Sequence, residues 1–231
     1  MMVEVVRLLE QCEFPTVGVW AQVNMGIVLV GMGRHIEAFE ELTLAANELD
    51  HLDQPGLFTV ALRGIAACLI ATNRANEAYS YLTKSREEAQ LADDQYRAIQ
   101  VDLQWAVALW EEGKVLECAG MIRDVLQSGN EANLGLFMID SLWVASKVSA
   151  AVDLDEASIL AHFAATSIRN DIGANDTLAI PQANIDLISI LEERVNKRKF
   201  QNWKMVALAD APRTEICRIC HLLSHNKSSK S

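Results

Sequence analysis

Helix-breaking residues that recur every 40 positions constrain this chain more than any other feature of its sequence. Each break lies between two amphipathic apolar stretches, and a small residue follows it five positions later. The breaks are Gly33, Asn73, Gly113 and Asp153, and the small residues after them are Ala38, Ala78, Cys118 and Ser158. A second series of small residues with the same spacing precedes the breaks, at Gly26, Ala66, Ala106 and Ser146. A fixed period of this length is typical of stacked helical hairpins. We therefore expect an all-α, right-handed solenoid of antiparallel hairpins.

The register of this period predicts how the chain is organised. We expect an unpaired second helix of a preceding half-unit at 1–16, four hairpins at 17–173, capping helices at 174–223 and a disordered tail at 224–231. The half-unit is inferred because Met2, Val5 and Leu9 lie 40 residues before Leu42, Ala45 and Leu49. An isolated half-unit exposes an apolar face. The chain is therefore expected to be a piece of a longer protein or to meet a partner at this end.

The small residues resemble those of the tetratricopeptide family, and the first unit carries all four of them, at Gly26, Gly33, Ala38 and Ala45. The usual unit of that family is about 34 residues long. Longer helices with a period near 40 are more similar to the sensor solenoids of large bacterial signalling proteins.

Residues 142–203 add a second resemblance. A small-residue-rich hairpin is followed by Arg169-x-x-x-Gly173, a helix led by Pro181, and Phe200-x-x-Trp203. This arrangement is similar to the last part of LuxR-type transcriptional regulators that join an ATPase, a tetratricopeptide-like region and a DNA-binding domain. The tail departs from that pattern, because Met205-Val206-Ala207 replaces a glycine. The resemblance implies the sensor region of a bacterial signal-transduction protein.

Charge and hydropathy exclude several classes of function. The longest apolar span, from Val17 to Gly33, contains Gln22 and Asn24 and is shorter than the roughly 20 apolar residues of a membrane helix. No signal peptide is evident at the start, so we expect a cytoplasmic protein that does not bind membranes. Of 20 basic and 31 acidic residues, eight and two lie in 197–231, which leaves 12 and 29 in the rest. The acidic body should repel phosphate, so we expect no direct nucleic acid binding by the repeats. The basic tail is expected to be a solvated terminus.

Sequence motifs give no support to an enzyme. No phosphate-binding loop, dinucleotide fingerprint, zinc-protease motif or serine-nucleophile motif is present. His35, His51 and His162 are expected at hairpin breaks or on a helix surface, without a catalytic partner. Cys12, Cys68 and Cys118 fall in apolar patterns and are expected to be small buried residues in a reducing compartment.

The sharpest chemical motif is Cys217-x-x-Cys220-His221, which matches covalent haem attachment, and His225 adds a fourth potential zinc ligand. Haem attachment requires an exported chain. Zinc prefers ligand pairs from separate elements, whereas these four side chains are predicted on one helix. We therefore expect no metal and no cofactor, and we interpret both cysteines as packing residues.

What remains is a binding groove, because the first helices of such hairpins line the concave face. The positions that should face it are occupied by Trp20, Val23, Ile27, Arg63, Ala67, Gln100, Leu103, Val107, Trp110, Trp143 and Lys147. Cations and tryptophans among apolar walls suit a protein or peptide partner, or an amphipathic small ligand with an acidic group. The alternative is that the tryptophans are packed between helices. A homo-oligomer is also compatible with such a surface, and a free-standing adaptor unrelated to transcription is the alternative function.

Overall fold

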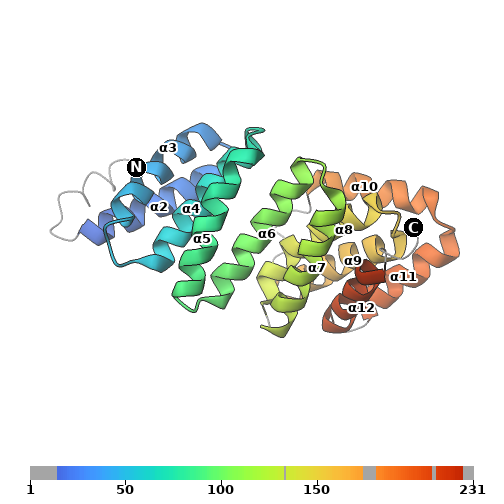
Figure 1. The fold of residues 1–231 in the computed structure, drawn as a ribbon. Helices are drawn as coiled ribbons and strands as arrows, with labels where there is room; N and C mark the ends of the chain where they lie inside the picture. The colour runs from blue at the N-terminus through green and yellow to red at the C-terminus, as the bar shows by residue number, and fades with distance from the viewer. Residues whose placement is uncertain (1–14, 133, 174–180, 210–211, 226–231) are drawn as a thin grey trace. The chain divides into compact units, whose positions relative to one another are not determined.

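The computed structural model describes residues 15–132, 134–173, 181–209 and 212–225, and every regular element in these ranges is an α-helix (Figure 1). The expectation of an all-α protein is therefore confirmed for this part of the chain. The half-unit expected around residues 2–12 lies outside the described ranges. None of the described helices combines the length and apolar composition needed to cross a membrane.

The helices fall into two compact units, Met1–Glu112 and Gly113–Ser231, which are described separately. The first unit contains α2 (Pro15–Gly31), α3 (His35–Leu49), α4 (Pro55–Ala71), α5 (Ala75–Leu91) and α6 (Gln95–Glu111). The second contains α7 (Val115–Glu131), α8 (Gly135–Ala151), α9 (Asp155–Asp171), α10 (Gln182–Arg194), α11 (Lys197–Ala209) and α12 (Pro212–His225). The division falls between α6 and α7, within the third expected hairpin. In the first unit α6 packs on α4 and α5, and in the second α7 packs on α8 and α12.

Short turns with one left-handed residue join the helices. Gly33 and Gly113 adopt φ values of 74° and 73°, and Asn73 and Asp153 adopt 59° and 61°. Asparagine and aspartate tolerate this backbone region better than other residues with a Cβ atom. The residues predicted as helix breaks therefore lie in turns. Asp93, at 51°, makes a further turn between α5 and α6 that was not predicted from the sequence.

The interior of the first unit is built around close contacts at small residues. Leu42 on α3 is fully buried between α2 and α4. A Cβ atom added at Gly26 would lie 2.6 Å from Leu42 Cδ2, and one at Gly64 would lie 2.7 Å from Leu42 Cδ1. Such distances are too short for packed carbon atoms, so both glycines are required for the close approach of these helices. Ala66 and Ala106 are also fully buried.

The second unit replaces some of this apolar packing with buried hydroxyl groups. Ser146 on α8 donates a hydrogen bond to the Ser158 carbonyl at 3.0 Å, and Ser158 on α9 donates to the Ser146 carbonyl at 2.7 Å. Both serines are fully buried. This reciprocal pair satisfies the two hydroxyls and ties α8 to α9.

The three C-terminal helices of the second unit pack against the helices before them. Leu191 on α10 and Phe200 on α11 join Ile159 on α9 in a small apolar cluster. Arg194 pairs with Asp155, and Arg218 on α12 pairs with Glu156, so two side chains at the start of α9 each hold a C-terminal helix. Ser224 and His225, which we expected in a disordered tail, form the last residues of α12.

Candidate ligand-binding groove

The hollow in the first unit that best matches the expected groove lies along the first helices of its hairpins. It has a volume of about 740 Å³ and is bounded by α2, the beginning of α4, and Arg97 of α6. Trp20 and Val23, two of the predicted groove residues, both line it. Trp20 is 57% exposed, whereas Val23 is buried and forms part of the floor. An exposed indole over an apolar floor is typical of binding surfaces, because the ring offers a large contact area with little loss of conformational freedom.

Arg97 reaches the hollow from α6 and was not predicted. Its backbone N–H donates to Asp94 Oδ1 at 2.9 Å, which caps α6, and its guanidinium also pairs with the Asp94 carboxylate. Partial burial acts to raise the pKa of Asp94, but the hydrogen bonds from Arg97 lower it overall. Gly56 makes room for the guanidinium, because a Cβ atom there would lie 3.1 Å from Arg97 Cζ. The Asp94–Arg97 spacing is the sequence signal that could have identified this cation.

Arg63 of α4 lies beside the same segment of α6. It is half-buried, and among the described residues it makes no hydrogen bond or ion pair. Burial lowers the pKa of Arg63, Tyr96 acts to raise it, and the nearby Arg97 acts to lower it. A guanidinium remains charged in a protein, so Arg63 is a partly desolvated cation. Gln100, another predicted residue, donates from Nε2 to the Tyr96 hydroxyl at 2.8 Å.

Neither Arg63 nor Gln100 lines the hollow at Trp20, and the remaining predicted groove residues also lie outside its lining. Leu103 and Trp110 are half-buried on α6, and neither lines the hollow at Trp20. Trp143 and Lys147 lie on α8, in the second unit. Trp143 is buried, and its carbonyl accepts a hydrogen bond from Asn184 of α10 at 3.0 Å. Its burial agrees with the alternative interpretation of this tryptophan as a packing residue.

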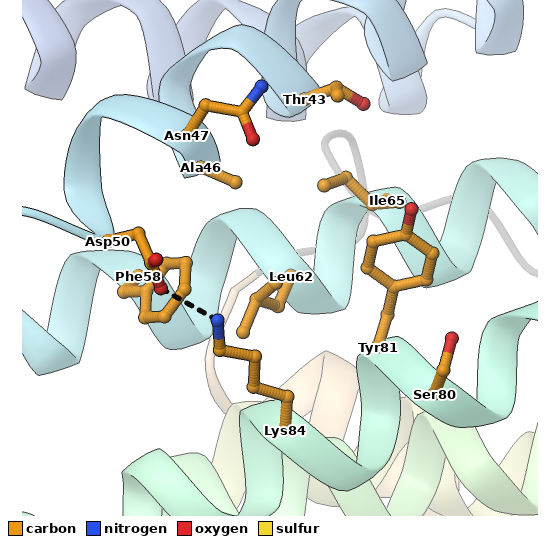
Figure 2. A pocket seen from close by; sticks show the side chains of 10 residues that line it. All are labelled: Thr43, Ala46, Asn47, Asp50, Phe58, Leu62, Ile65, Ser80, Tyr81 and Lys84. Carbon is orange, nitrogen blue, oxygen red and sulfur yellow. Dashed lines mark hydrogen bonds and ion pairs between the residues drawn. The ribbon is translucent and has the colours of Figure 1, made fainter.

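A separate hollow in the first unit opens between α3 and α5, with α4 beneath it (Figure 2). Its volume is about 280 Å³. Lys84 Nζ of α5 lies 2.7 Å from Asp50 Oδ1, just beyond the end of α3, and 4.6 Å from the centroid of the Phe58 ring. This hollow was not predicted from the sequence, because the expected binding surface was restricted to the faces of the first helices.

The burial of His162 differs from the sequence prediction, whereas the burial of Cys68 and Cys118 agrees with it. His162, which we expected on a helix surface or at a break, is 4% exposed, and burial followed by the influence of Lys204 lowers its pKa to about 4. The prediction was wrong because His162 holds the register position of Leu42, Leu82 and Ile122, which are all fully buried. Cys68 and Cys118 are buried as expected, and burial raises the pKa of their thiols to about 11 and about 12. Cys12 lies outside the described residues.

The motif that includes Cys217 and Cys220 lies on α12, beside α7. Cys217 is exposed, and Cys220 is half-buried with its thiol donating to the Arg123 carbonyl at 3.6 Å. Burial is the main cause that raises the pKa of Cys220 to about 11. The rings of His221 and His225 contact each other with centroids 4.3 Å apart. Among the described residues, no three His, Cys, Asp or Glu side chains are grouped so that they could hold a metal ion.

Comparison with known proteins gives no relative: no family model, no curated protein and no solved structure matches this chain.

Proposed function

We propose that this protein is a non-enzymatic binding module, and that its groove on α2, α4 and α6 of the first unit takes a peptide or small ligand with an acidic group. The observation that carries the proposal is the exposed Trp20 on the wall of a hollow that also includes Arg97. Large exposed aromatic rings beside cations are enriched at the energetic centres of binding surfaces.

The proposed architecture is a right-handed, tetratricopeptide-like solenoid. The helix bounds support it, since α2, α4, α6 and α8 begin at residues 15, 55, 95 and 135. The left-handed turn residues Gly33, Asn73, Gly113 and Asp153 recur with the same spacing. In such stacks each hairpin contacts mainly its neighbours, so the first helices are free to line a continuous binding surface.

The charges favour an acidic ligand. Arg97 is already paired with Asp94, whereas Arg63 has no ion-pair partner among the described residues. A carboxylate that reached Arg63 would form a charge-assisted hydrogen bond, which is stronger than a neutral one. The apolar part of the same ligand would contact Trp20 and Val23. We therefore propose a peptide in which an acidic side chain or carboxyl terminus lies close to an apolar residue.

Selection from a random peptide display library tests this proposal. The wild-type chain should enrich peptides in which a carboxylate neighbours an aromatic or aliphatic residue. Arg63→Gln should lose the preference for the carboxylate, while Arg34→Gln, at an exposed site where the guanidinium pairs with Glu37, should retain it. Enrichment of basic peptides, or the same consensus from both variants, would contradict the assignment.

A place for this module within a LuxR-type ATPase regulator is part of the proposal and rests on the resemblance of residues 142–203. Binding in the groove would then favour one conformation of a larger assembly through differential affinity. Coding sequence for an ATPase and a DNA-binding domain adjoining this chain would support that placement. Their absence would favour the free-standing adaptor.

A further inference from the structure

The hollow between α3 and α5, hereafter the α3–α5 pocket, has an apolar floor made by buried side chains. Four buried side chains line the pocket: Ala46, Phe58, Leu62 and Ile65. Figure 2 shows side chains from three helices turned toward this common space. An apolar group that enters the pocket would be transferred from water to contact with this apolar floor, which is favourable.

Several residues that line the pocket differ in chemistry from those that stand 40 residues later in the same unit. Forty residues after Ala46 and Leu62 stand Arg86 and Asp102, whose side chains form an ion pair with Arg86 Nε 3.2 Å from Asp102 Oδ1. Forty residues after Ile65 stands Trp105, which contacts the ring of Tyr79. The lining of the α3–α5 pocket is therefore particular to these side chains. It does not recur 40 residues further along the chain.

The rim of the pocket offers hydrogen bonds without net charge. Asp50 and Lys84 neutralise each other at one end. The hydroxyls of Thr43 and Ser80 donate to carbonyls of their own helices, at 2.6 Å and 3.0 Å, and keep their lone pairs as acceptors.

Two further rim groups have unused hydrogen-bonding capacity. Among the described residues, the Asn47 amide and the Tyr81 hydroxyl have no hydrogen-bond partner. An occupant could therefore both donate to and accept from the rim.

The size of the pocket limits what can occupy it. A cavity of about 150 Å³ holds benzene, and drug-sized ligands occupy roughly 300–1,000 Å³. The α3–α5 pocket, at about 280 Å³, lies between these limits. We propose that it is a second binding site, independent of the groove at Trp20, which takes an uncharged single-ring molecule carrying a hydroxyl or amide group.

Titration of the full chain with p-cresol, followed by amide NMR, tests this site. The probe is uncharged at neutral pH and combines one ring with one hydroxyl. We expect saturable shifts at α3 and α5. Ser80→Trp, at the exposed rim, and Ala46→Arg, which copies residue 86, should each weaken binding by about tenfold or more through loss of space. Leu44→Arg is the matched control for Ala46→Arg, because Leu44 also lies on α3 but outside the pocket. This variant should bind p-cresol as the wild type does.

The hydroxyl is tested by a second comparison. Tyr81→Phe should weaken p-cresol about three- to tenfold, the effect of one lost hydrogen bond, and leave toluene unaffected. Three results would overturn the site: no saturable shift with p-cresol, unchanged affinity in folded Ser80→Trp, or 4-methylbenzoate binding as tightly as p-cresol.

Discussion

Leu42 shows how single residues set the distance between helices in the first unit. Its side chain is fully enclosed, and both Gly26 and Gly64 leave the space that its methyl groups occupy. Glycine in the middle of a helix is unfavourable by roughly 0.5–1 kcal/mol relative to alanine. At these two positions that cost is offset by contacts that any larger residue would prevent.

Gly64→Val should therefore destabilise the first unit by about 1–3 kcal/mol, the typical cost of overpacking. Gly120→Ala is the control, because Gly120 is also inside a helix but a Cβ atom there meets nothing within 4 Å. It should stabilise its unit by roughly 0.5–1 kcal/mol. Urea unfolding followed by circular dichroism measures both. Equal effects of the two substitutions would contradict the assigned role of Gly64.

His162 should make stability depend on pH. Its pKa in the folded chain is about 4, below the ordinary value of 6.5, because it is buried near Lys204. Between these values the unfolded chain binds a proton that the folded chain does not. Stability from this residue is therefore complete above pH 6.5, is lost as the pH falls toward 4, and amounts to about 3 kcal/mol. His162→Leu should remove this part of the dependence when the free energy of unfolding is measured from pH 4 to 7. An unchanged pH profile would refute the burial of a neutral histidine.

At the scale of elements, the contact between α8 and α9 depends on two serines that serve each other. Removing one hydroxyl deletes a hydrogen bond and leaves a buried carbonyl without that donor, while removing both leaves an interface of small apolar groups.

The Ser146→Ala and Ser158→Ala single variants should each lose about 1–2 kcal/mol of unfolding free energy. The double variant should lose less than the sum of the two, with a coupling of at least about 0.5 kcal/mol. Urea unfolding of the four proteins in the cycle gives this value. Strict additivity would show that the two hydroxyls act separately.

The position of α12 against α7 should appear in the reactivity of its cysteines. Cys217 is exposed, whereas Cys220 is half-buried with a pKa of about 11. Because only the thiolate reacts, iodoacetamide at pH 8 should modify Cys217 at least about ten times faster than Cys220. Trypsin cuts between them at Arg218, so mass spectrometry reports each rate. In urea-unfolded protein, which serves as the control, the two cysteines should react at similar rates. Equal rates in the native chain as well would contradict the docking of α12.

The sequence predicted the helical elements and their turns well, because apolar periodicity and turn residues are local properties. Gly33 and Asp153 were found from spacing alone. Burial was predicted less well at His162, whose polar side chain suggested a surface position. Its place in the 40-residue register is that of Leu42, Leu82 and Ile122, which are all fully buried. Arg97 was missed because the groove positions predicted in α6 began at Gln100, although Val17 and Leu57, which share the register position of Arg97, also line the hollow.

At the scale of the whole molecule, the chain combines two helical units with an uneven charge. The candidate groove was predicted to run along all first helices, but the hollow that holds the exposed indole of Trp20 and the guanidinium of Arg97 lies within the first unit. Trp20, Arg63 and Arg97 lie within a strongly acidic segment of sequence. A local cationic site in such surroundings discriminates against strongly acidic partners, so the ligand is expected to carry few negative charges.

Calorimetric titration of a peptide selected on the wild-type chain tests the central claim most directly. Trp20→Ala and Arg63→Gln should each raise the Kd by about tenfold or more, as loss of an aromatic or arginine anchor does. Leu91→Ala, at an exposed apolar residue of the same unit outside the groove, should leave the Kd unchanged. If both groove variants stay folded and bind like the wild type, the first-helix groove is not the binding site.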